Sequence, residues 1–395
     1  MVEFRGYRRE DGRIGVRNHV AVIPVSLVSS KIAEQIAAEV GDRARATPHQ
    51  MGSSQPERSR AQTERTLVGT GRNPNVGAAL VVELGTEDVD AERIAGEIAE
   101  SGKRVETLSI REAGGTQNSI ERGEDLVKEL TTDVVDVRRE SADTSELVVA
   151  VECGGSDATS GIAANPAVGN TCDRIVKSGG TVCFSETPEF IGAEHVLAER
   201  CVDPEIRERL LERVEMREDM ARLMGVDMRG AQPTPGNQEG GLTTIEEKSL
   251  GAISKGGTTP VREMVDYASP LPVNEGLVLM DTPGYDVESV VGMVAGGAQI
   301  VVFTTGRGST TGNPIAPVIK VTGNPKTWSR MANNMDVNAS TVIRGDSLSD
   351  VGERIYDEIL QVADGSRTEA ERRKLEEFAI NEIQPNELTE LRGDV

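Results

Sequence analysis

Aromatic residues are scarce in this chain. Phe, Trp and Tyr together make up 3% of the 395 residues, so a hydrophobic core has to be built from Val, Ile, Leu, Ala and Met. The sequence also has no run of about 18 apolar residues and no charged-then-apolar amino terminus. It therefore predicts neither a membrane span nor a signal peptide. The length leaves room for one large domain or for two to three ordinary domains.

Histidine and cysteine are also few, with three and four residues respectively. Three imidazoles exclude a histidine-rich metal site, so oxygen atoms would have to supply most ligands of any bound metal. No two cysteines form a CxxC pair, which excludes a zinc ribbon and a thioredoxin-type motif. Cys172, Cys183 and Cys201 have apolar or helical surroundings and are expected to be small core residues. Cys153 differs from them because it lies on a glycine loop.

Basic residues are outnumbered by acidic ones. The chain has 65 acidic residues against 43 basic ones, of which nine are lysine, and its formal net charge is −22. This charge excludes nucleic acid and an anionic membrane surface as partners. Few lysines, many acids and a core of small residues are typical of cytosolic proteins of salt-accumulating halophiles, so we expect a cytoplasmic protein. The acids are spread along the chain, and most of them are expected to be solvated surface.

Two nucleotide-binding fingerprints are missing. The segment Asp281–Asp286 (DTPGYD) resembles a GTPase switch motif, but no G-x-x-x-x-G-K-[ST] loop precedes it. No G-x-G-x-x-G follows the first expected strand either. The sequence therefore excludes a P-loop GTPase and gives no support to a dinucleotide site.

What is present is a regular alternation of strand-like and helix-like segments, which is typical of βαβ units with a parallel sheet. We therefore expect an α/β fold with mainly parallel sheets flanked by helices. We expect an N-terminal α/β domain over residues 1–140 and a C-terminal catalytic α/β domain over residues 141–395. The expected strands cover 20–25, 78–82, 105–110, 146–151, 181–184, 277–280 and 299–303, and the expected helices include 91–100, 119–129, 166–178, 187–225, 287–294, 348–362 and 369–380.

Six small, polar, glycine-rich loops lie in the second half of the chain, four of them directly after expected strands. The carboxyl ends of parallel strands are where small-molecule sites form in α/β sheets. The loops therefore predict a shared pocket for an anionic, polyhydroxylated ligand, in which backbone N–H groups, Lys255 and Arg307 bind carboxylate. The six loops cover residues 152–157, 185–189, 235–241, 255–260, 281–286 and 304–309.

The loop Glu152–Asp157 (ECGGSD) carries two carboxylates, a thiol and a hydroxyl, and its two glycines allow a close approach of the backbone to a ligand. Glu152 and Asp157 are the first candidates for acid–base catalysis or metal binding, although such a loop can also be an ordinary polar turn with helix-capping residues. Glu186 and Glu189 come next, and the alternative for them is capping of the helix after Pro188.

The sequence predicts different roles for the histidines. His195 lies on an expected helix with apolar neighbours, where a base, a metal ligand and a packed side chain are all compatible with the sequence. His19 lies next to the first strand and is expected to be structural.

Over nearly its whole length the chain resembles the altronate/galactarate dehydratase family, which includes the large subunit of sulfolactate sulfo-lyase. The resemblance is carried by Gly6–Arg13, Arg72–Val76, Glu112–Thr116, Glu152–Asp157, Ala164–Pro166, Ser185–Glu189, Gly192–His195, Pro235–Asn237, Gly240–Thr244, Glu247–Ser249, Lys255–Gly257, Asp281–Asp286 and Thr304–Gly308.

The resemblance implies a lyase that eliminates a group β to a carboxylate. The group is water from a sugar acid such as altronate or galactarate, which gives a 2-keto-3-deoxy acid, or sulfite from sulfolactate. It also implies activation by a divalent metal (Fe²⁺, Mn²⁺ or Mg²⁺), a homo-oligomer, and a separate small subunit, because the chain starts directly at the GYRREDGR segment. His49 falls where the family has a histidine, which implies a ligand or a base.

The chain departs from the family at three positions. Val28, Ser53 and Thr86 stand where relatives usually carry cysteine, and Cys153 is the remaining member of that set. This departure disfavours a thiolate-rich iron site and favours oxygen-ligated Mg²⁺ or Mn²⁺. It also keeps two alternatives open: a changed reaction, such as sulfite release from sulfolactate, and a non-catalytic sugar-acid-binding relative.

The site expected from the sequence therefore has three groups of residues. The catalytic candidates are Glu152, Asp157, His195 and His49; the substrate-binding candidates are Gly154, Gly155, Ser156, Asn165, Asn237, Lys255, Thr305 and Arg307; and the metal-ligand candidates are Cys153, Glu186, Glu189 and Asp281.

Overall fold

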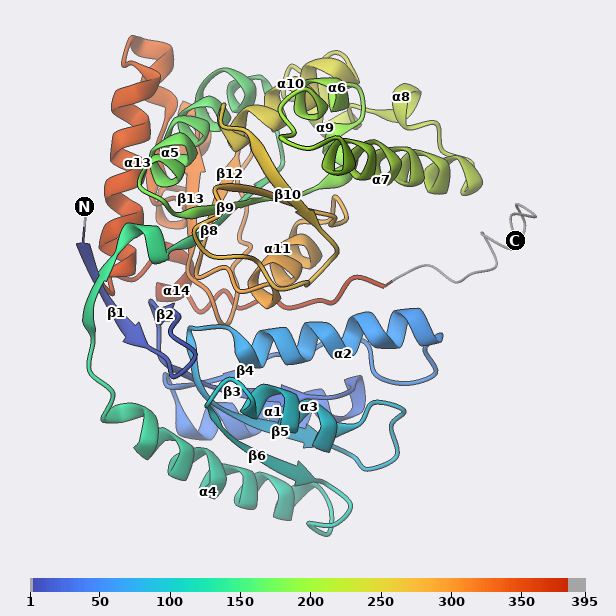
Figure 1. The fold of residues 1–395 in the computed structure, drawn as a ribbon, viewed down its shortest axis with the longest axis vertical. Helices are drawn as coiled ribbons and strands as arrows, with labels where there is room; N and C mark the ends of the chain where they lie inside the picture. Colours follow the sequence, from blue (N-terminus) through green and yellow to red (C-terminus); the bar gives the residue numbers. More distant parts are fainter. Residues whose placement is uncertain (1–2, 383–395) are drawn as a thin grey trace.

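Two parallel β-sheets with helices on their faces make up the chain, as the computed structural model of residues 3–382 shows (Figure 1). This arrangement confirms the expected α/β fold with mainly parallel sheets. The four-stranded sheet comes from the first part of the sequence and the seven-stranded sheet from the rest. The domain boundary at residue 140 stays a prediction.

The seven-stranded sheet has the order β10-β11-β9-β8-β12-β13-β14, and all of its strands are parallel. Its central strand is buried on both faces, as continuous apolar runs in parallel sheets require. The predicted strands 146–151, 181–184, 277–280 and 299–303 all belong to this sheet. Its strands are β8 (Val148–Gly154), β9 (Thr181–Phe184), β10 (Val261–Val265), β11 (Leu277–Met280), β12 (Ile300–Thr305), β13 (Val318–Thr322) and β14 (Val337–Asn338).

Helices cover both faces of this sheet. On one face, α5 (Asn165–Lys177) packs against α13 (Leu348–Ala363), and α11 (Asp286–Ala295) lies on the opposite face. Ala, Val and Ile side chains of α5 and α13 recur at helical spacing and are buried against the sheet.

A group of shorter helices, together with α7, lies beside the carboxyl end of the sheet. The segment 187–225 is mainly helical, as predicted, but it is not continuous. It has a 3-10 turn over Thr187–Phe190 and two helices, because Gly192 has φ +97° and Pro204 starts a new helix. The helices of this group are α6 (Glu194–Ala198), α7 (Pro204–Leu223), α8 (Met228–Ala231), α9 (Pro235–Glu239), α10 (Ile245–Ile253) and α12 (Pro325–Arg330).

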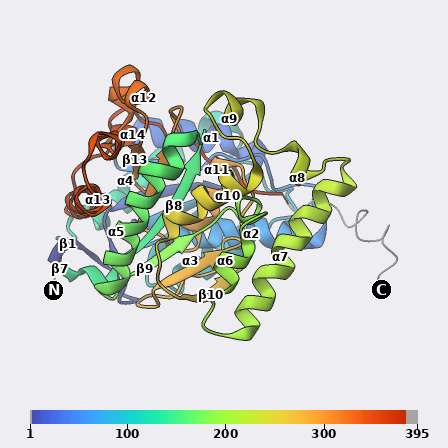
Figure 2. The ribbon, with the colours of Figure 1, turned by 90° about the horizontal axis from the view of Figure 1, so that it is seen from above.

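Figure 2 shows α7 on the outside of the molecule, on the side opposite to α13. The part of the chain that the structure describes has no helix that is both long enough and apolar enough to cross a bilayer.

The four-stranded sheet has the order β4-β3-β5-β6 and is also parallel. One face is covered by α1 and α4, the other by α2 and α3. Its elements are β3 (His19–Pro24), α1 (Leu27–Val40), β4 (Ala44–Ala46), α2 (Glu57–Arg72), β5 (Val76–Glu83), α3 (Ala91–Ala99), β6 (Arg104–Ser109) and α4 (Thr116–Val135).

A small antiparallel sheet joins segments far apart in the sequence. Strand β1 (Glu3–Arg8) pairs with β2 (Ile14–Gly15) on one side and with β7 (Glu140–Asp143) on the other. The backbone N–H of Arg5 also donates to the Asp364 carboxylate at 2.6 Å, just after α13. The amino-terminal strand is thus attached to the helix that covers the seven-stranded sheet.

The two parallel sheets meet through α2 and α11, which pack directly on each other (Figure 1). A Cβ atom on Gly69 of α2 would lie 2.3 Å from the carbonyl oxygen of Ala295 on α11, so this close approach requires glycine. Buried apolar residues of both sheets form one continuous cluster across the junction.

The carboxyl-terminal stretch after α14 (Glu369–Arg372) runs along the junction (Figure 1). The prediction of a helix over 369–380 is wrong beyond residue 372. The chain is not helical there because its side chains and backbone make contacts between the two sheets. Ile380 is fully buried, and its carbonyl oxygen accepts a hydrogen bond from Gln50 at 2.8 Å.

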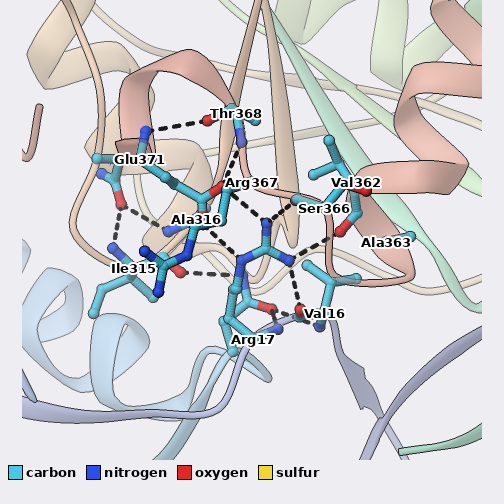
Figure 3. A network of polar contacts seen from close by, with 12 residues as sticks. Val16, Arg17, Ile315, Ala316, Val362, Ala363, Ser366, Arg367, Thr368 and Glu371 are labelled. Carbon is cyan, nitrogen blue, oxygen red and sulfur yellow. Dashed lines mark hydrogen bonds and ion pairs between the residues drawn. The ribbon is translucent and has the colours of Figure 1, made fainter. Parts of the chain in front are cut away.

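Arg17 lies at the centre of a network that ties the first part of the chain to residues 362–371 (Figure 3). Its guanidinium makes two hydrogen bonds to the Glu371 carboxylate, at 2.6 and 2.9 Å. It also donates to the carbonyl oxygens of Val362 and Ser366. Such a bidentate pair with extra carbonyl acceptors satisfies a buried arginine.

We expect Arg17→Met to lower the free energy of unfolding by about 3 kcal/mol, because it leaves a buried carboxylate and several carbonyls without their donor. Urea unfolding of the two proteins measures the difference. Arg367→Met is the matched control, because Arg367 is exposed and pairs with Asp42 at 3.4 Å, a contact worth less than about 1 kcal/mol. Equal effects of the two substitutions would contradict the assigned role of Arg17.

Candidate functional site

The candidate site lies at the carboxyl end of β8. From this strand the chain proceeds to β9 on one side, while β12 leads on to β13 on the other side. This reversal of strand order opens a crevice between β8 and β12, which is where α/β sheets bind ligands. Gly154 at the end of β8 is in register with Thr305 of β12.

The six glycine-rich loops come together here. Ser156 in the first loop accepts a hydrogen bond from Asn237 in the third, and the carbonyl of Gly155 accepts one from the backbone of Arg307 in the sixth. The second loop contacts the remaining two, because Glu186 binds Lys255 and its backbone N–H donates to the Thr282 hydroxyl.

Glu152 is the innermost carboxylate of the site. It is fully buried at the end of β8, on the face that α11 covers. Its Oε2 atom accepts hydrogen bonds from the hydroxyls of Ser289 on α11, at 2.6 Å, and Ser185, at 3.1 Å. Its Oε1 atom is buried and has no hydrogen-bond partner among the described residues.

Glu186 and Lys255 form a fully buried ion pair next to Glu152. The Lys255 Nζ lies 2.6 Å from Glu186 Oε2, which also accepts a hydrogen bond from the backbone N–H of Cys153 at 3.0 Å. Glu186 has a left-handed backbone with φ +70°, uncommon for a residue with a side chain. Its Oε1 atom, like that of Glu152, is buried without a partner in the described chain.

Cys153 is buried next to Lys255, with 4% of its surface exposed. Its Sγ is 3.0 Å from the Lys255 Nζ, so the ammonium bridges the thiol and the Glu186 carboxylate. Burial, together with the charge of Glu186, raises the pKa of the Cys153 thiol well above its usual value. The predicted core residues Cys172 and Cys183 are buried, and Cys201 is partly buried.

Asp286 is the third carboxylate of the cluster. It begins α11, and a Cβ atom on Gly154 would lie 2.0 Å from its Oδ2. Glycine at position 154 is therefore what admits this side chain to the sheet edge. One carboxylate oxygen from each of Glu152, Glu186 and Asp286 lies within 4.8 Å of the other two.

Burial and neighbouring charges shift the pKa values of the side chains in this cluster. Burial and then the neighbouring Glu186 raise the pKa of Glu152 well above its usual value. The same two causes raise the pKa of Asp286 to about 7. Burial alone would lower the pKa of Lys255, but Cys153 and Glu186 outweigh it, so its pKa is raised and the side chain stays charged.

These three carboxylates can hold a divalent cation. Two of them carry buried oxygens without hydrogen-bond partners in the described chain, which is costly unless a cation or a proton compensates it. Lys255 supplies one positive charge against three carboxyl groups. An all-oxygen donor set suits Mg²⁺ or Mn²⁺ better than a soft metal.

The predicted metal ligands Cys153, Glu186, Glu189 and Asp281 are not all in this cluster. Glu186 belongs to it, and Cys153 contacts its lysine. Glu189 pairs with Lys248 at 2.9 Å, and Asp281 pairs with Arg217 at 2.9 Å.

Several predicted site residues hold the loops in place. The Asp157 carboxylate accepts hydrogen bonds from the Thr159 hydroxyl, the Ser160 backbone and the Asn324 amide. Three more predicted site residues hold the loops through side-chain hydrogen bonds. These bonds join Asn165 to Gly251 and Thr304, Asn237 to Ser156 and Thr234, and Thr305 to Gly308.

The two predicted carboxylate anchors differ in access. Lys255 is 0% exposed and its ammonium already contacts Glu186 and Cys153. Arg307 is exposed and pairs with Glu239 at 3.1 Å on the surface.

The histidines lie outside the cluster. His195 is exposed on α6. His49 is buried after β4, where one ring nitrogen contacts the carbonyl oxygen of Pro24 at 2.8 Å and the other accepts from the backbone of Met51 at 3.2 Å. Both nitrogens of His49 are thus used by the backbone.

Val28, Ser53 and Thr86 all follow strands of the four-stranded sheet and are exposed. Val28 lies in the first turn of α1, Ser53 and Thr86 lie on loops, and all three are in a different part of the chain from Cys153.

Sequence reasoning missed Asp286 and Lys248. It chose the first aspartate of the DTPGYD loop, whereas the last one begins a helix and points back to the sheet edge. Lys248 is three residues after the buried Ile245 of α10 and next to the buried Ser249, so helical spacing places it on the buried face. A lysine on the buried face of a helix was the sequence signal that could have identified Lys248.

The sequence matches two family profiles. The profile described as D-galactarate/Altronate dehydratase, C-terminal, matches residues 144–386, and the profile described as D-galactarate dehydratase/Altronate hydrolase, second domain, matches residues 6–135. Among relatives, a (2R)-sulfolactate sulfo-lyase subunit beta of Chromohalobacter salexigens is 39% identical over 383 residues, covering 96% of this chain and 97% of the relative.

Two further relatives are named as dehydratases. The altronate dehydratase of Bacillus subtilis is 33% identical over 390 residues, covering 95% of this chain and 77% of the relative. The galactarate dehydratase (L-threo-forming) of Escherichia coli is 37% identical over 311 residues, covering 77% of this chain and 59% of the relative.

Gly154→Ala tests the carboxylate cluster. The added methyl group would overlap Asp286 Oδ2, so Asp286 has to leave the cluster and Mn²⁺ affinity should fall by at least about tenfold. Isothermal titration of the protein with Mn²⁺ measures this affinity. Gly96→Ala is the control, because a Cβ at Gly96 meets nothing within 4 Å. Unchanged Mn²⁺ binding by the Gly154 variant would rule out this cluster as the cation site.

The burial of His49 predicts a pH effect on stability. Burial lowers its pKa from 6.5 to about 4, so below pH 6.5 the unfolded chain binds a proton that the folded chain does not. Stability is therefore lost as the pH falls from 6.5 towards 4. Between pH 7 and 4.5 we expect the wild type to lose about 2–3 kcal/mol more than His49→Gln. Parallel pH dependences of urea unfolding in the two proteins would refute this role.

Proposed function

The chain belongs to the D-galactarate/altronate dehydratase family, and we propose that it is a lyase acting on a small hydroxy acid. In this reaction a proton leaves the carbon next to a carboxylate, and the group on the following carbon is expelled. The first candidate substrate is a sugar acid such as altronate or galactarate, which loses water to give a 2-keto-3-deoxy acid.

The buried cluster of Glu152, Glu186, Asp286 and Lys255 carries this proposal. Two fully buried carboxylates, a partly buried third one and a fully buried ammonium cost free energy, and such clusters are typical of sites that handle charge during a reaction. The cluster lies at the switch point of the sheet, beside the loop Glu152–Asp157. This combination favours an enzyme over a sugar-acid-binding relative without activity.

Glu152, Glu186 and Asp286 would hold a divalent cation through their facing oxygens. When bound, such a cation stabilises the negative charge that develops on a substrate carboxylate as the neighbouring proton leaves. Lys255 holds the Glu186 carboxylate in place, and Ser185 and Ser289 do the same for Glu152.

Sulfite release from sulfolactate is a second candidate. It is favoured by the relative named as a sulfo-lyase subunit, which is 39% identical and matches along nearly its whole length. Because that relative is named as a subunit, we also propose a separate small subunit as partner. We also propose that the protein works in the cytoplasm of a salt-accumulating cell, because its acidic residues outnumber its basic ones.

A substrate panel tests the function. The chain, purified with any subunit that copurifies, is incubated with Mn²⁺, Mg²⁺ or Fe²⁺ and with altronate, galactarate or sulfolactate. A 2-keto-3-deoxy acid without sulfite supports the dehydratase, and sulfite supports the second candidate. If no combination of metal and acid gives either product, the lyase proposal is wrong.

Glu152→Gln tests whether the cluster performs the reaction. We expect kcat to fall at least about a thousandfold while hydroxy-acid binding is partly preserved, because the substitution removes a charge that acts on the transition state. Steady-state kinetics and titration with substrate separate the two effects. Glu199→Gln, at an exposed position, is the control. Full turnover by the Glu152 variant would place the active site elsewhere.

A further inference from the structure

A cavity opens next to the loop Glu152–Asp157, and one lysine lines it. The cavity has a volume of about 280 Å³, and its lining includes Ser156, Asp157, Ser160, Asn165, Glu247 and Lys248 together with Leu242 and Leu250. This volume is close to the lower end of the range for small-molecule sites, which begins at about 300 Å³. It suits a ligand of few carbons that carries polar groups.

Lys248 reaches this cavity from α10 with its side chain 12% exposed. Its Nζ lies 2.9 Å from a Glu189 oxygen and donates to the Gln232 side chain at 3.0 Å. An ammonium group has three N–H donors. Two acceptors in the described chain therefore leave one donor available to a ligand in the cavity.

The charge of Lys248 is retained. Burial alone would lower its pKa, but the adjacent Glu189, and more distantly Cys153 and Glu186, outweigh burial and raise it. Lys248 thus carries a positive charge at the wall of the cavity, where it can hold the negatively charged end of a ligand.

Ser156 offers a second free group on a fixed loop. Its hydroxyl makes no hydrogen bond to the part of the chain that the structure describes, whereas its carbonyl oxygen accepts one from Asn237 at 2.9 Å. The preceding Gly155 carbonyl accepts from the backbone of Arg307 at 3.0 Å. The loop is therefore held by its backbone, and the Ser156 hydroxyl remains available for a ligand hydroxyl.

The other basic side chains near the loops are less suitable. Lys255 is fully buried with both of its contacts inside the cluster, and Arg307 pairs with Glu239 at the surface. Neither of them lines the cavity.

We propose that Lys248 binds the oxyanion of the hydroxy acid, with Ser156 on a neighbouring hydroxyl. The proposal rests on the lyase function and adds to it the residue that recognises the substrate's charged end. Altronate, galactarate and sulfolactate all carry a carboxylate next to a hydroxyl-bearing carbon, and this carboxylate is the small oxyanion that Lys248 requires.

Kinetics of Lys248→Gln with galactarate and with sulfolactate test this assignment. For the compound that is turned over we expect KM to rise about 10- to 100-fold and kcat to change less than about threefold, because the lost contact exists before and during the reaction. Lys248→Arg should recover most of the affinity. Lys128→Gln, at an exposed lysine paired with Glu124 on α4, should leave both constants unchanged.

Binding measured without turnover separates this role from a structural one. In titrations of wild type and Lys248→Gln, affinity for galactarate should fall by the same factor as KM rises, whereas affinity for its neutral diamide should be equal in the two proteins. Equal losses for acid and diamide would show that Lys248 only supports the fold of the site. That result would overturn the proposal.

The two proposals fail in different ways. If wild type turns over none of altronate, galactarate and sulfolactate, the lyase function fails and the assignment of Lys248 fails with it. If wild type is active and the KM of Lys248→Gln is unchanged with the acid it uses, only the assignment is wrong.

Discussion

The ion pair between Lys255 and Glu186 is the interaction on which the candidate site depends. Both side chains are out of contact with solvent, and removing one partner of such a pair costs about 3–5 kcal/mol. The pair also fixes geometry. Glu186 keeps its left-handed backbone at the end of β9, while Lys255 joins the turn after α10 to the end of β8 through Cys153. Two strand ends and one helix end are thus held around a patch of negative charge.

Most of the fold follows from patterns that are local in the sequence. Strands such as β8 and β12 are continuous apolar runs followed by glycine and polar residues, and this combination is a strong signal for a buried parallel strand. Elements that depend on distant partners were harder to predict. Strands β1 and β7 have little apolar character and exist because they pair with each other across more than 130 residues.

The sequence predicted which loops form the site, but not which side chains supply the candidate metal-ligand atoms. The six loops do meet, because parallel strands bring their carboxyl ends to one edge. Asp286 reaches the cluster because Gly154 has no side chain, whereas Asp281 pairs with Arg217, and no local pattern records either contact. The stretch 373–380 has helical periodicity, yet it is taken up by the junction between the sheets, where Phe378 and Ile380 are buried.

The same junction has a consequence for how the molecule is made. Arg17 leaves the ribosome early, but its carboxylate partner Glu371 is 354 residues further along the chain. Gln50 and Gln62 likewise receive their partners from residues 380 and 381. Both sheets can form and α2 can pack on α11 during synthesis, whereas these contacts across the seam form only when the last described residues emerge. Contacts of such long sequence separation form slowly, so the junction between the sheets is completed last.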